Sequence, residues 1–142
     1  MFGSSVSEAL AEAGATLITA SRSLERNQEF AELLKSRGYA AHAMQVDIGE
    51  PESIKTLHAQ VGERFGALDI LVNSSVVSGV TGFEEQEIEH WENSAQANMV
   101  GLFAMCQGFV PGRGKRGRGS VINISSIYGW WPTTPPCTRG PI

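Results

Sequence analysis

The sequence predicts an α/β fold in which a parallel sheet carries helices on both faces. Short apolar runs alternate along the chain with longer stretches that have helical periodicity. One run, residues 68–73 (LDILVN), is continuously apolar, as in a parallel strand that is buried on both faces. Glycine and proline stand at the boundaries of the helical stretches, where they end or begin helices.

Start and stop signals place the individual elements. Ser23 can cap a helix that Gly38 ends, Gly14 ends an earlier helix, and Pro51 suits the first turn of a later one. Pro111 breaks a long helix. In chain order we expect helices over residues 4–13, 24–37, 51–65 and 85–110, and strands over residues 15–20, 39–46, 68–73 and 120–125.

Both ends of the chain depart from this alternation. The chain opens on a helix with no strand before it, and its last strand is followed by no crossover helix. Residues 129–142 hold four of the six prolines and two adjacent tryptophans, without strand or helix periodicity. We therefore expect a domain over residues 1–128 and an irregular proline-rich tail over residues 129–142.

Composition limits the function classes. The chain has 142 residues, of which 42% are hydrophobic and 18% charged, as in a single globular domain. Its formal net charge of −4 argues against a nucleic-acid-binding protein. It shows no secretory leader and no membrane-spanning apolar run, so we expect a cytoplasmic protein. Two cysteines and three scattered histidines lack the spacing of a disulfide framework or a metal site.

Polar side chains follow several of the expected strands. Asp47, Asn73 and the pair Ser125-Ser126 come at carboxyl ends, which line the ligand crevice of open parallel sheets. Ordinary loop hydrogen bonding is the alternative interpretation. Asn98 lies instead inside the long helix, on or beside its apolar stripe, so its amide needs partners and has either a structural or a functional role.

Two further positions are candidates for phosphate binding. Gly3 precedes a helix, where backbone N–H groups and the helix dipole attract anions, although a small residue at a helix start is also common. Ser21 and Arg22 directly follow the strand at 15–20, and in a dinucleotide-binding fold this position meets the adenosine ribose. A solvated arginine is the alternative there.

A basic segment, GRGKRGRG at residues 112–119, holds four of the eleven basic residues. It lacks the spacing of a phosphate-binding Walker loop. A solvated loop is the favoured interpretation of so short a charge cluster, and contact with a nucleic-acid backbone is the distant alternative.

Taken together, these residues resemble the short-chain dehydrogenase/reductase family over about residues 3–129. The stretch SEALAEAGATLITASRS resembles the family's first helix, second strand and ribose-contact turn, and VDIGEPESI its third strand end and following helix. LDILVN, NMVG at 98–101 and GSVINISSIYG at 119–129 follow in the family's order and at about its spacing.

The resemblance implies a Rossmann-like doubly wound parallel sheet that is incomplete. The family's first strand and its C-terminal strands have no counterpart in these 142 residues. In the family order, the missing first strand lies between the strands at 15–20 and 68–73. Both of these strands are therefore expected to have an unpaired edge.

The resemblance also implies cofactor contacts. Gly3 matches the last glycine of the phosphate-binding turn, and Asp47 with Ile48 matches the pair that contacts adenine. Arg22 matches the basic residue associated with NADP preference. Ser21 occupies the place of the acidic residue found in NAD-preferring members, so the resemblance implies NADP(H) in preference to NAD(H).

Three residues match positions near the reacting atoms. Asn73 matches the first residue of the Asn-Asn-Ala-Gly motif, but Ser74-Ser75-Val76 follows it in place of Asn-Ala-Gly. Asn98 matches the active-site asparagine that holds a water in the proton relay. Ser126 matches the catalytic serine that hydrogen-bonds the substrate oxygen.

The family's catalytic tyrosine and lysine have no match. The tyrosine normally comes about thirteen residues after the serine, which falls near Arg139, and the lysine four residues later, past Ile142. Tyr128 is too close to Ser126 to replace the tyrosine. The tail could come from a frameshift or an alternative exon.

The resemblance therefore implies an NADP(H)-dependent oxidoreductase that transfers hydride between the cofactor and a small carbonyl or alcohol substrate, with this chain as a catalytically impaired fragment. The alternative is a non-catalytic partner-binding or functionless truncated product. The helix at 85–110 resembles the family's subunit-interface helix and implies a homo-oligomer. We expect no binding to membranes or nucleic acid.

Overall fold

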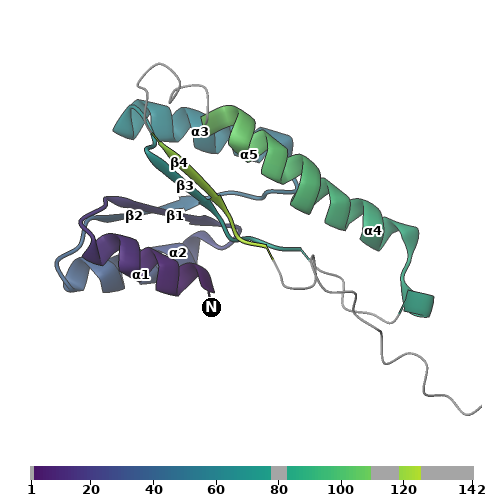
Figure 1. Ribbon diagram of the computed structural model, residues 1–142, viewed down its shortest axis with the longest axis horizontal. Coiled ribbons are helices and arrows are strands. Elements are labelled where there is room, and N and C mark those ends of the chain that lie inside the picture. The colour runs from purple at the N-terminus through teal and green to yellow at the C-terminus, as the bar shows by residue number, and fades with distance from the viewer. Residues whose placement is uncertain (1, 78–82, 110–118, 126–142) are drawn as a thin grey trace, which may run out of the picture.

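Two pairs of parallel strands lie between helices in the computed structural model, which describes residues 2–77, 83–109 and 119–125 (Figure 1). The expected tail at 129–142 lies outside the described residues. In chain order the elements are α1 (Phe2–Glu12), β1 (Leu17–Ser21), α2 (Leu24–Ser36), β2 (Ala41–Gln45), α3 (Pro51–Phe65), β3 (Ile70–Asn73), the short helix η1 (Phe83–Glu85), α4 (Ile88–Ala95), the π-helix η2 (Gln96–Gly101), α5 (Leu102–Phe109) and β4 (Ser120–Asn123).

The start and stop signals act as predicted. Ser23 caps α2, since its hydroxyl oxygen accepts a hydrogen bond from the backbone N–H of Arg26 at 3.3 Å. Pro51 occupies the first turn of α3. The chain leaves α2 and α3 through Gly38 and Gly66, whose φ angles of +88° and +76° favour glycine.

The single helix expected over residues 85–110 is instead interrupted by the π-helix η2, which separates α4 from α5. A π-helix widens one turn of the helix and often occurs at functional sites. Asn98 lies within this segment. Apolar residues continue at three- to four-residue steps on both sides, so the sequence pattern does not reveal the interruption.

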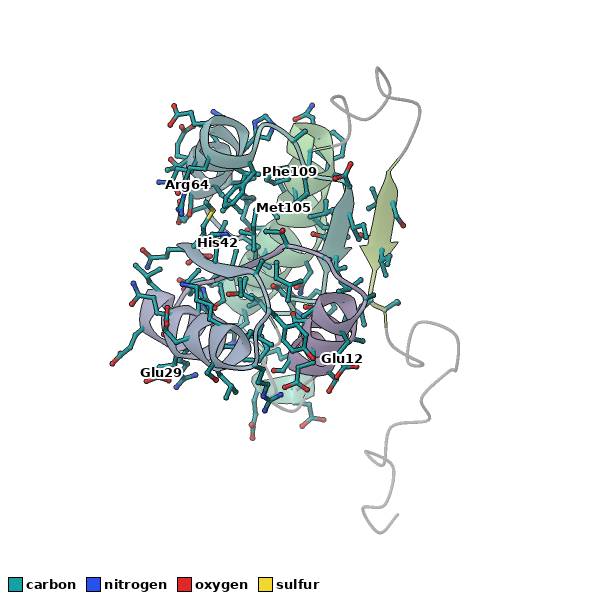
Figure 2. All side chains as sticks on the ribbon, turned by 90° about the vertical axis from the view of Figure 1, so that its left-hand side faces the viewer. Glu12, Glu29, His42, Arg64, Met105 and Phe109 are labelled. Atoms are coloured by element: carbon teal, nitrogen blue, oxygen red, sulfur yellow. The ribbon has the colours of Figure 1, made fainter. Side chains whose placement is uncertain are left out.

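Helices cover the strands on both faces, as the fold class requires (Figure 1). On one face, α1 and α2 pack against β1 and β2 through Ala11, Leu17, Ala31, Leu34 and Ala41. On the other, α3 and α5 form the larger cluster, and Figure 2 shows Met105 and Phe109 of α5 directed toward its interior. Its buried members are Met44, Val46, Ile54, Leu57, Val61, Leu71, Met105 and Phe109.

The two strand pairs share this larger cluster but not a common sheet. β1 pairs with β2 from Leu17↔Ala41 onward, and β3 pairs with β4 from Ile70↔Ser120 onward, both in parallel. Within the described part of the chain, no strand is hydrogen-bonded to the facing edges of β1 and β3. The expectation of unpaired edges at these two strands is therefore confirmed.

The expectation that the strand at 68–73 is buried on both faces is wrong in part. Leu71 is 5% exposed, but Ile70 is 38% exposed, and Val121 and Ile122 of the neighbouring β4 are 38% and 43% exposed. Among the described residues, β3 has a strand on one side only and β4 pairs with β3 alone, so few neighbouring strands cover these side chains.

We expect the isolated 142-residue chain to lack a cooperative unfolding transition and to aggregate or behave as a molten state. Each buried backbone group left without a hydrogen bond costs about 1–3 kcal/mol, against about 5–15 kcal/mol for a whole domain. Two-stranded sheets are themselves marginally stable. Thermal unfolding followed by circular dichroism tests this expectation, and a sharp melt of soluble monomer would contradict it.

Candidate functional site

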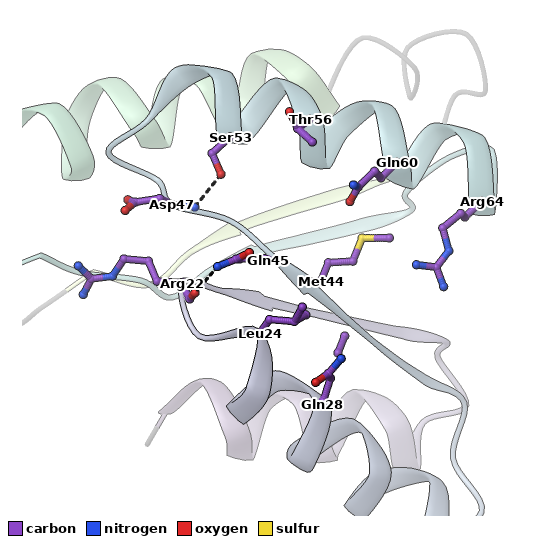
Figure 3. A pocket seen from close by; sticks show the side chains of 11 residues that line it. Arg22, Leu24, Gln28, Met44, Gln45, Asp47, Ser53, Thr56, Gln60 and Arg64 are labelled. Carbon is purple, nitrogen blue, oxygen red and sulfur yellow. Dashed lines mark hydrogen bonds between the residues drawn. The ribbon is translucent and has the colours of Figure 1, made fainter.

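A groove of about 640 Å³ runs along the outer edge of β2, between α2 and α3 (Figure 3). Its volume lies within the range of small-molecule sites. Figure 3 shows Arg22 toward one end and Arg64 toward the other, with Asp47 near Arg22. The lining residues are Arg22, Leu24, Gln28, Ala43, Met44, Gln45, Asp47, Ser53, Thr56, Gln60 and Arg64.

Arg22 and Ser21, which the sequence places together, have different surroundings. The Arg22 side chain is exposed and lines the groove, and no carboxylate of the described residues lies within ion-pair distance of its guanidinium. Ser21 is absent from the groove lining. Its hydroxyl donates instead to Oδ1 of Asn27 at 2.8 Å. Arg22 is thus the member of the pair that is available to a ligand in the groove.

The turn after β2 is fixed by two hydrogen bonds of Asp47. Its Oδ1 accepts from the backbone N–H of Gly49 at 2.9 Å, and its own N–H donates to Oγ of Ser53, also at 2.9 Å (Figure 3). Ile48 packs partly buried against the larger cluster. The two residues expected to contact adenine therefore lie in an ordered turn at one end of the groove.

Gly101 brings the π-helix against this same turn. A Cβ atom on Gly101 would lie 2.0 Å from the carbonyl oxygen of Ile48, so no larger side chain fits without movement of the backbone. The last residue of η2 therefore contacts the turn after β2 directly. This contact links the groove to the helical segment that contains Asn98.

The amide of Asn98 is occupied by the loop after β3. Its Oδ1 accepts from the backbone N–H of Val77 at 2.9 Å, and its Nδ2 donates to the carbonyl of Val77 at 2.6 Å and to Oγ of Ser94 at 3.0 Å. Asn98 therefore has a structural role. Its expected role in holding a water stays a prediction.

The remaining predicted residues lie around the end of β3. Nδ2 of Asn73 donates to Oδ1 of Asn123 at 2.8 Å and lies 3.7 Å from Sγ of Cys106. Gly3, in the first turn of α1, is next to Ser74, since its Cβ position is 3.1 Å from the Ser74 Oγ. The start of α1 and the end of β3 thus meet. The predicted catalytic residue, Ser126, lies outside the described residues.

The predicted residues that the structure describes therefore form two groups at the carboxyl ends of the strands. Arg22 and Asp47 share the groove beside β1 and β2. Gly3, Asn73 and Asn98 gather around the segment that follows β3.

Within the described residues, the structure shows no cluster of three side chains that could hold a metal ion, and no helix long and apolar enough to cross a membrane.

Sequence reasoning missed three residues that shape this region: Asn27, Gln45 and Gly101. Asn27 is 9% exposed and shares the inner face of α2 with Ala31 and Leu34, so a polar residue at an apolar spacing was the available signal. For Gly101 the signal was an isolated glycine inside a helix. The sequence pattern contains no signal that distinguishes Gln45 from other exposed polar residues.

Comparison with known proteins assigns the chain to a protein family. The sequence profile of the family described as short chain dehydrogenase matches residues 2–135, and the chain belongs to this family. An uncharacterized oxidoreductase of Thermotoga maritima is 29% identical over 124 residues, which are 87% of this chain and 48% of that protein. The chain spans about half the length of the curated relatives it matches.

Two solved structures share the fold in complex with a cofactor. An actinorhodin polyketide ketoreductase with NADPH is 26% identical, with a TM-score of 0.86 over 93% of this chain and 51% of that one. An L-sorbose reductase from Gluconobacter frateurii, complexed with NADPH and L-sorbose, is 29% identical, with a TM-score of 0.82 over 88% and 48%. The expected Rossmann-like family fold is confirmed.

One end of the groove combines a cationic side chain with the turn after β2. Arg22 is a cation of the groove that no carboxylate of the described residues neutralises, and a group of this kind can bind a phosphate. Ser21 contributes no carboxylate that would repel a phosphate. Asp47 and Ile48 follow the adjacent strand, at the same edge of the pair.

We expect Gly101→Ala to destabilise the packing of η2 against the turn after β2 by about 1–3 kcal/mol, the usual cost of forcing extra volume into a packed site. Gly62→Ala, in the exposed face of α3 with no atom within 4 Å of its Cβ position, is the matched control. That change should instead stabilise α3 by about 0.5–1 kcal/mol. Resistance to limited proteolysis measures both effects. A Gly101→Ala chain as resistant as the wild type would contradict the contact with Ile48.

Proposed function

We propose that this chain carries the adenosine-binding part of an NADP(H)-dependent oxidoreductase that acts on a small carbonyl or alcohol substrate. The observation that carries the proposal is Arg22, exposed on the groove without a carboxylate partner among the described residues and close to the Asp47 turn. Membership of the short-chain dehydrogenase family supports the reaction class. The structural relatives with NADPH support the cofactor.

Bound NADPH would supply the hydride. The chain's own residues would hold the adenosine end through Arg22 and the Asp47 turn, and would fix the segment after β3 through Asn98. Reduction of a carbonyl also needs an acid that protonates the developing alkoxide. These 142 residues contain two tyrosines, Tyr39 and Tyr128, and neither has a lysine four residues later. We therefore propose that the 142 residues alone do not turn over.

NADPH should bind more tightly than NADH, and Arg22→Ala should remove the difference. A charge-assisted hydrogen bond to phosphate contributes about 1.5–3 kcal/mol, so NADPH affinity should fall at least about tenfold while NADH affinity stays the same. Arg64→Ala, at the other end of the groove, is the matched control and should leave the preference intact. Calorimetric titration measures both affinities. Equal binding of the two cofactors by the wild type would contradict the proposal.

The chain should not oxidise NADPH above background with a panel of ketones and aldehydes. Loss of a positioned general acid costs about 10²–10⁴-fold in rate, and a serine hydroxyl is too weak an acid to replace it at neutral pH. The assay monitors NADPH absorbance for the wild type and for Ser126→Ala. Both should give the same background rate, and turnover that depends on Ser126 would overturn the proposed impairment.

An apolar stripe on α4, η2 and α5 favours a second proposal, that two copies of the chain associate. Ile88, Trp91, Met99 and Phe103 are 58–73% exposed and follow one another, with Ala95 between them, at three- to four-residue steps. Contiguous exposed apolar surface of this kind marks interaction sites. This surface would serve either an active oligomer or a non-catalytic partner-binding chain.

Phe103→Glu should convert a self-associated chain to monomer, because a buried carboxylate without a partner is costly. Lys55→Glu, an equally exposed change of charge on α3, should leave the mass unchanged. Sedimentation velocity across a concentration series measures the mass of each. A wild-type chain that stays monomeric throughout would exclude this interface.

A further inference from the structure

We infer that Asn27 and Gln45 are positioning residues that fix the direction of Arg22, and so set how strongly the groove prefers nucleotides that carry a 2′-phosphate. The inference rests on the proposed function, in which Arg22 binds that phosphate. Both residues act through the backbone on either side of Arg22, and neither needs to touch the ligand.

Asn27 joins the ends of two strands from inside the fold. It projects from α2, is 9% exposed, and its Nδ2 donates to the carbonyl of Met44 in β2 at 2.7 Å. The same nitrogen lies 3.4 Å from the carbonyl oxygen of Ser21, and Oδ1 accepts from the Ser21 hydroxyl at 2.8 Å. Asn27 thereby reinforces the attachment of Ser21, the residue before Arg22, whose carbonyl oxygen also accepts from the backbone N–H of Val46 just after β2 at 3.0 Å.

The chemistry of Met44 fixes the orientation of this amide. A backbone carbonyl only accepts, so the nitrogen of the amide must face Met44 and the oxygen must face Ser21. The Ser21 hydroxyl is then the donor to Asn27 at 2.8 Å, with the carbonyl oxygen of Ser23 as a more distant acceptor at 3.5 Å. Ser21 is consequently a link between Asn27 and the turn, since its hydroxyl points toward α2 and its side chain does not line the groove.

Gln45 holds the other side of Arg22. Its Nε2 donates to the Arg22 carbonyl oxygen at 2.9 Å, as the dashed line in Figure 3 shows. Met44 and Gln45 are consecutive residues of β2, so one strand end anchors both attachments. Asp47 follows two residues later on the same segment.

The peptide groups on both sides of the Arg22 Cα are therefore held to β2, which fixes the direction of its Cα–Cβ bond. What remains free is rotation within the side chain itself. Fixing a binding group before the ligand arrives reduces the entropy lost on binding. Loss of either attachment should weaken the interaction with the 2′-phosphate and leave the rest of the nucleotide unaffected.

Calorimetric titration of the 142-residue chain with adenosine 2′,5′-bisphosphate and with adenosine 5′-monophosphate tests this inference, because the two ligands differ only in the 2′-phosphate. Asn27→Leu and Gln45→Ala should each weaken the bisphosphate about three- to tenfold, the effect of one lost hydrogen bond, and change the monophosphate by less than about twofold. Ser36→Ala also removes a side-chain hydrogen bond from α2, far from the groove, and should change neither affinity.

Combining Asn27→Leu with Arg22→Ala distinguishes a positioning role of Asn27 from a general loss of structure. In an Arg22→Ala chain, the further change Asn27→Leu should have no effect on either ligand, because the group it positions is gone. Ser21→Ala keeps Asn27 and removes the hydroxyl bond to its Oδ1, together with the 3.5 Å contact to the Ser23 carbonyl, so it should weaken the bisphosphate in the same direction as Asn27→Leu even where the latter folds poorly. The exposed Gln45 gives an independent variant with an intact core.

The outcomes distinguish the inference from the proposed function. A wild-type chain that binds the two nucleotides equally would overturn the role of Arg22 in phosphate binding, and the inference with it. A wild-type preference that persists in Asn27→Leu and Gln45→Ala would overturn the inference alone. An equal loss of affinity for both nucleotides would also overturn it, because the two amides would then be merely structural.

Discussion

Hydrogen bonding between parallel strands holds β1 to β2 and β3 to β4, and it stops between β1 and β3. Apolar side chains nevertheless pack against one another across the gap between β1 and β3. Ile18 and Ala20 of β1 pack against the same cluster that contains Leu71 of β3 and Met105 of α5. The two halves are therefore joined by non-directional apolar packing where directional pairing is missing. This division explains the exposed side chains of β3 and β4 and the expected lack of a cooperative transition.

The candidate site is divided in the same way. The groove with Arg22 and Asp47 lies along β2 between α2 and α3, whereas Asn98 holds the segment after β3. The backbone contact between Gly101 and the carbonyl of Ile48 links the two parts. The adenosine end of a cofactor would therefore find its contacts within one strand pair. This explains why we propose cofactor binding and turnover as separable properties of the chain.

The sequence predicted most of the fold because its signals are local. Apolar periodicity, the Ser23 cap and the glycine at 38 depend on nearby residues, and the helices they predict are present within a few residues. The π-helix η2 could not be predicted in this way, since the apolar steps continue on both sides of it and the contact of its Gly101 with Ile48 joins residues distant in sequence. The role of Asn27 likewise depends on β2, which is distant in sequence.

Hydrogen–deuterium exchange followed by NMR tests the broken pairing most directly. Successive amides of a parallel strand point to opposite neighbours. Leu17 of β1 donates to Ala40, the residue before β2, and Asn73 of β3 accepts from Ile124, the residue after β4. The amides of Ile18 and Val72 should therefore face the unpaired position and exchange fast, and those of Thr19 and Leu71 should be protected. Uniform protection along β1 and β3 would contradict the account.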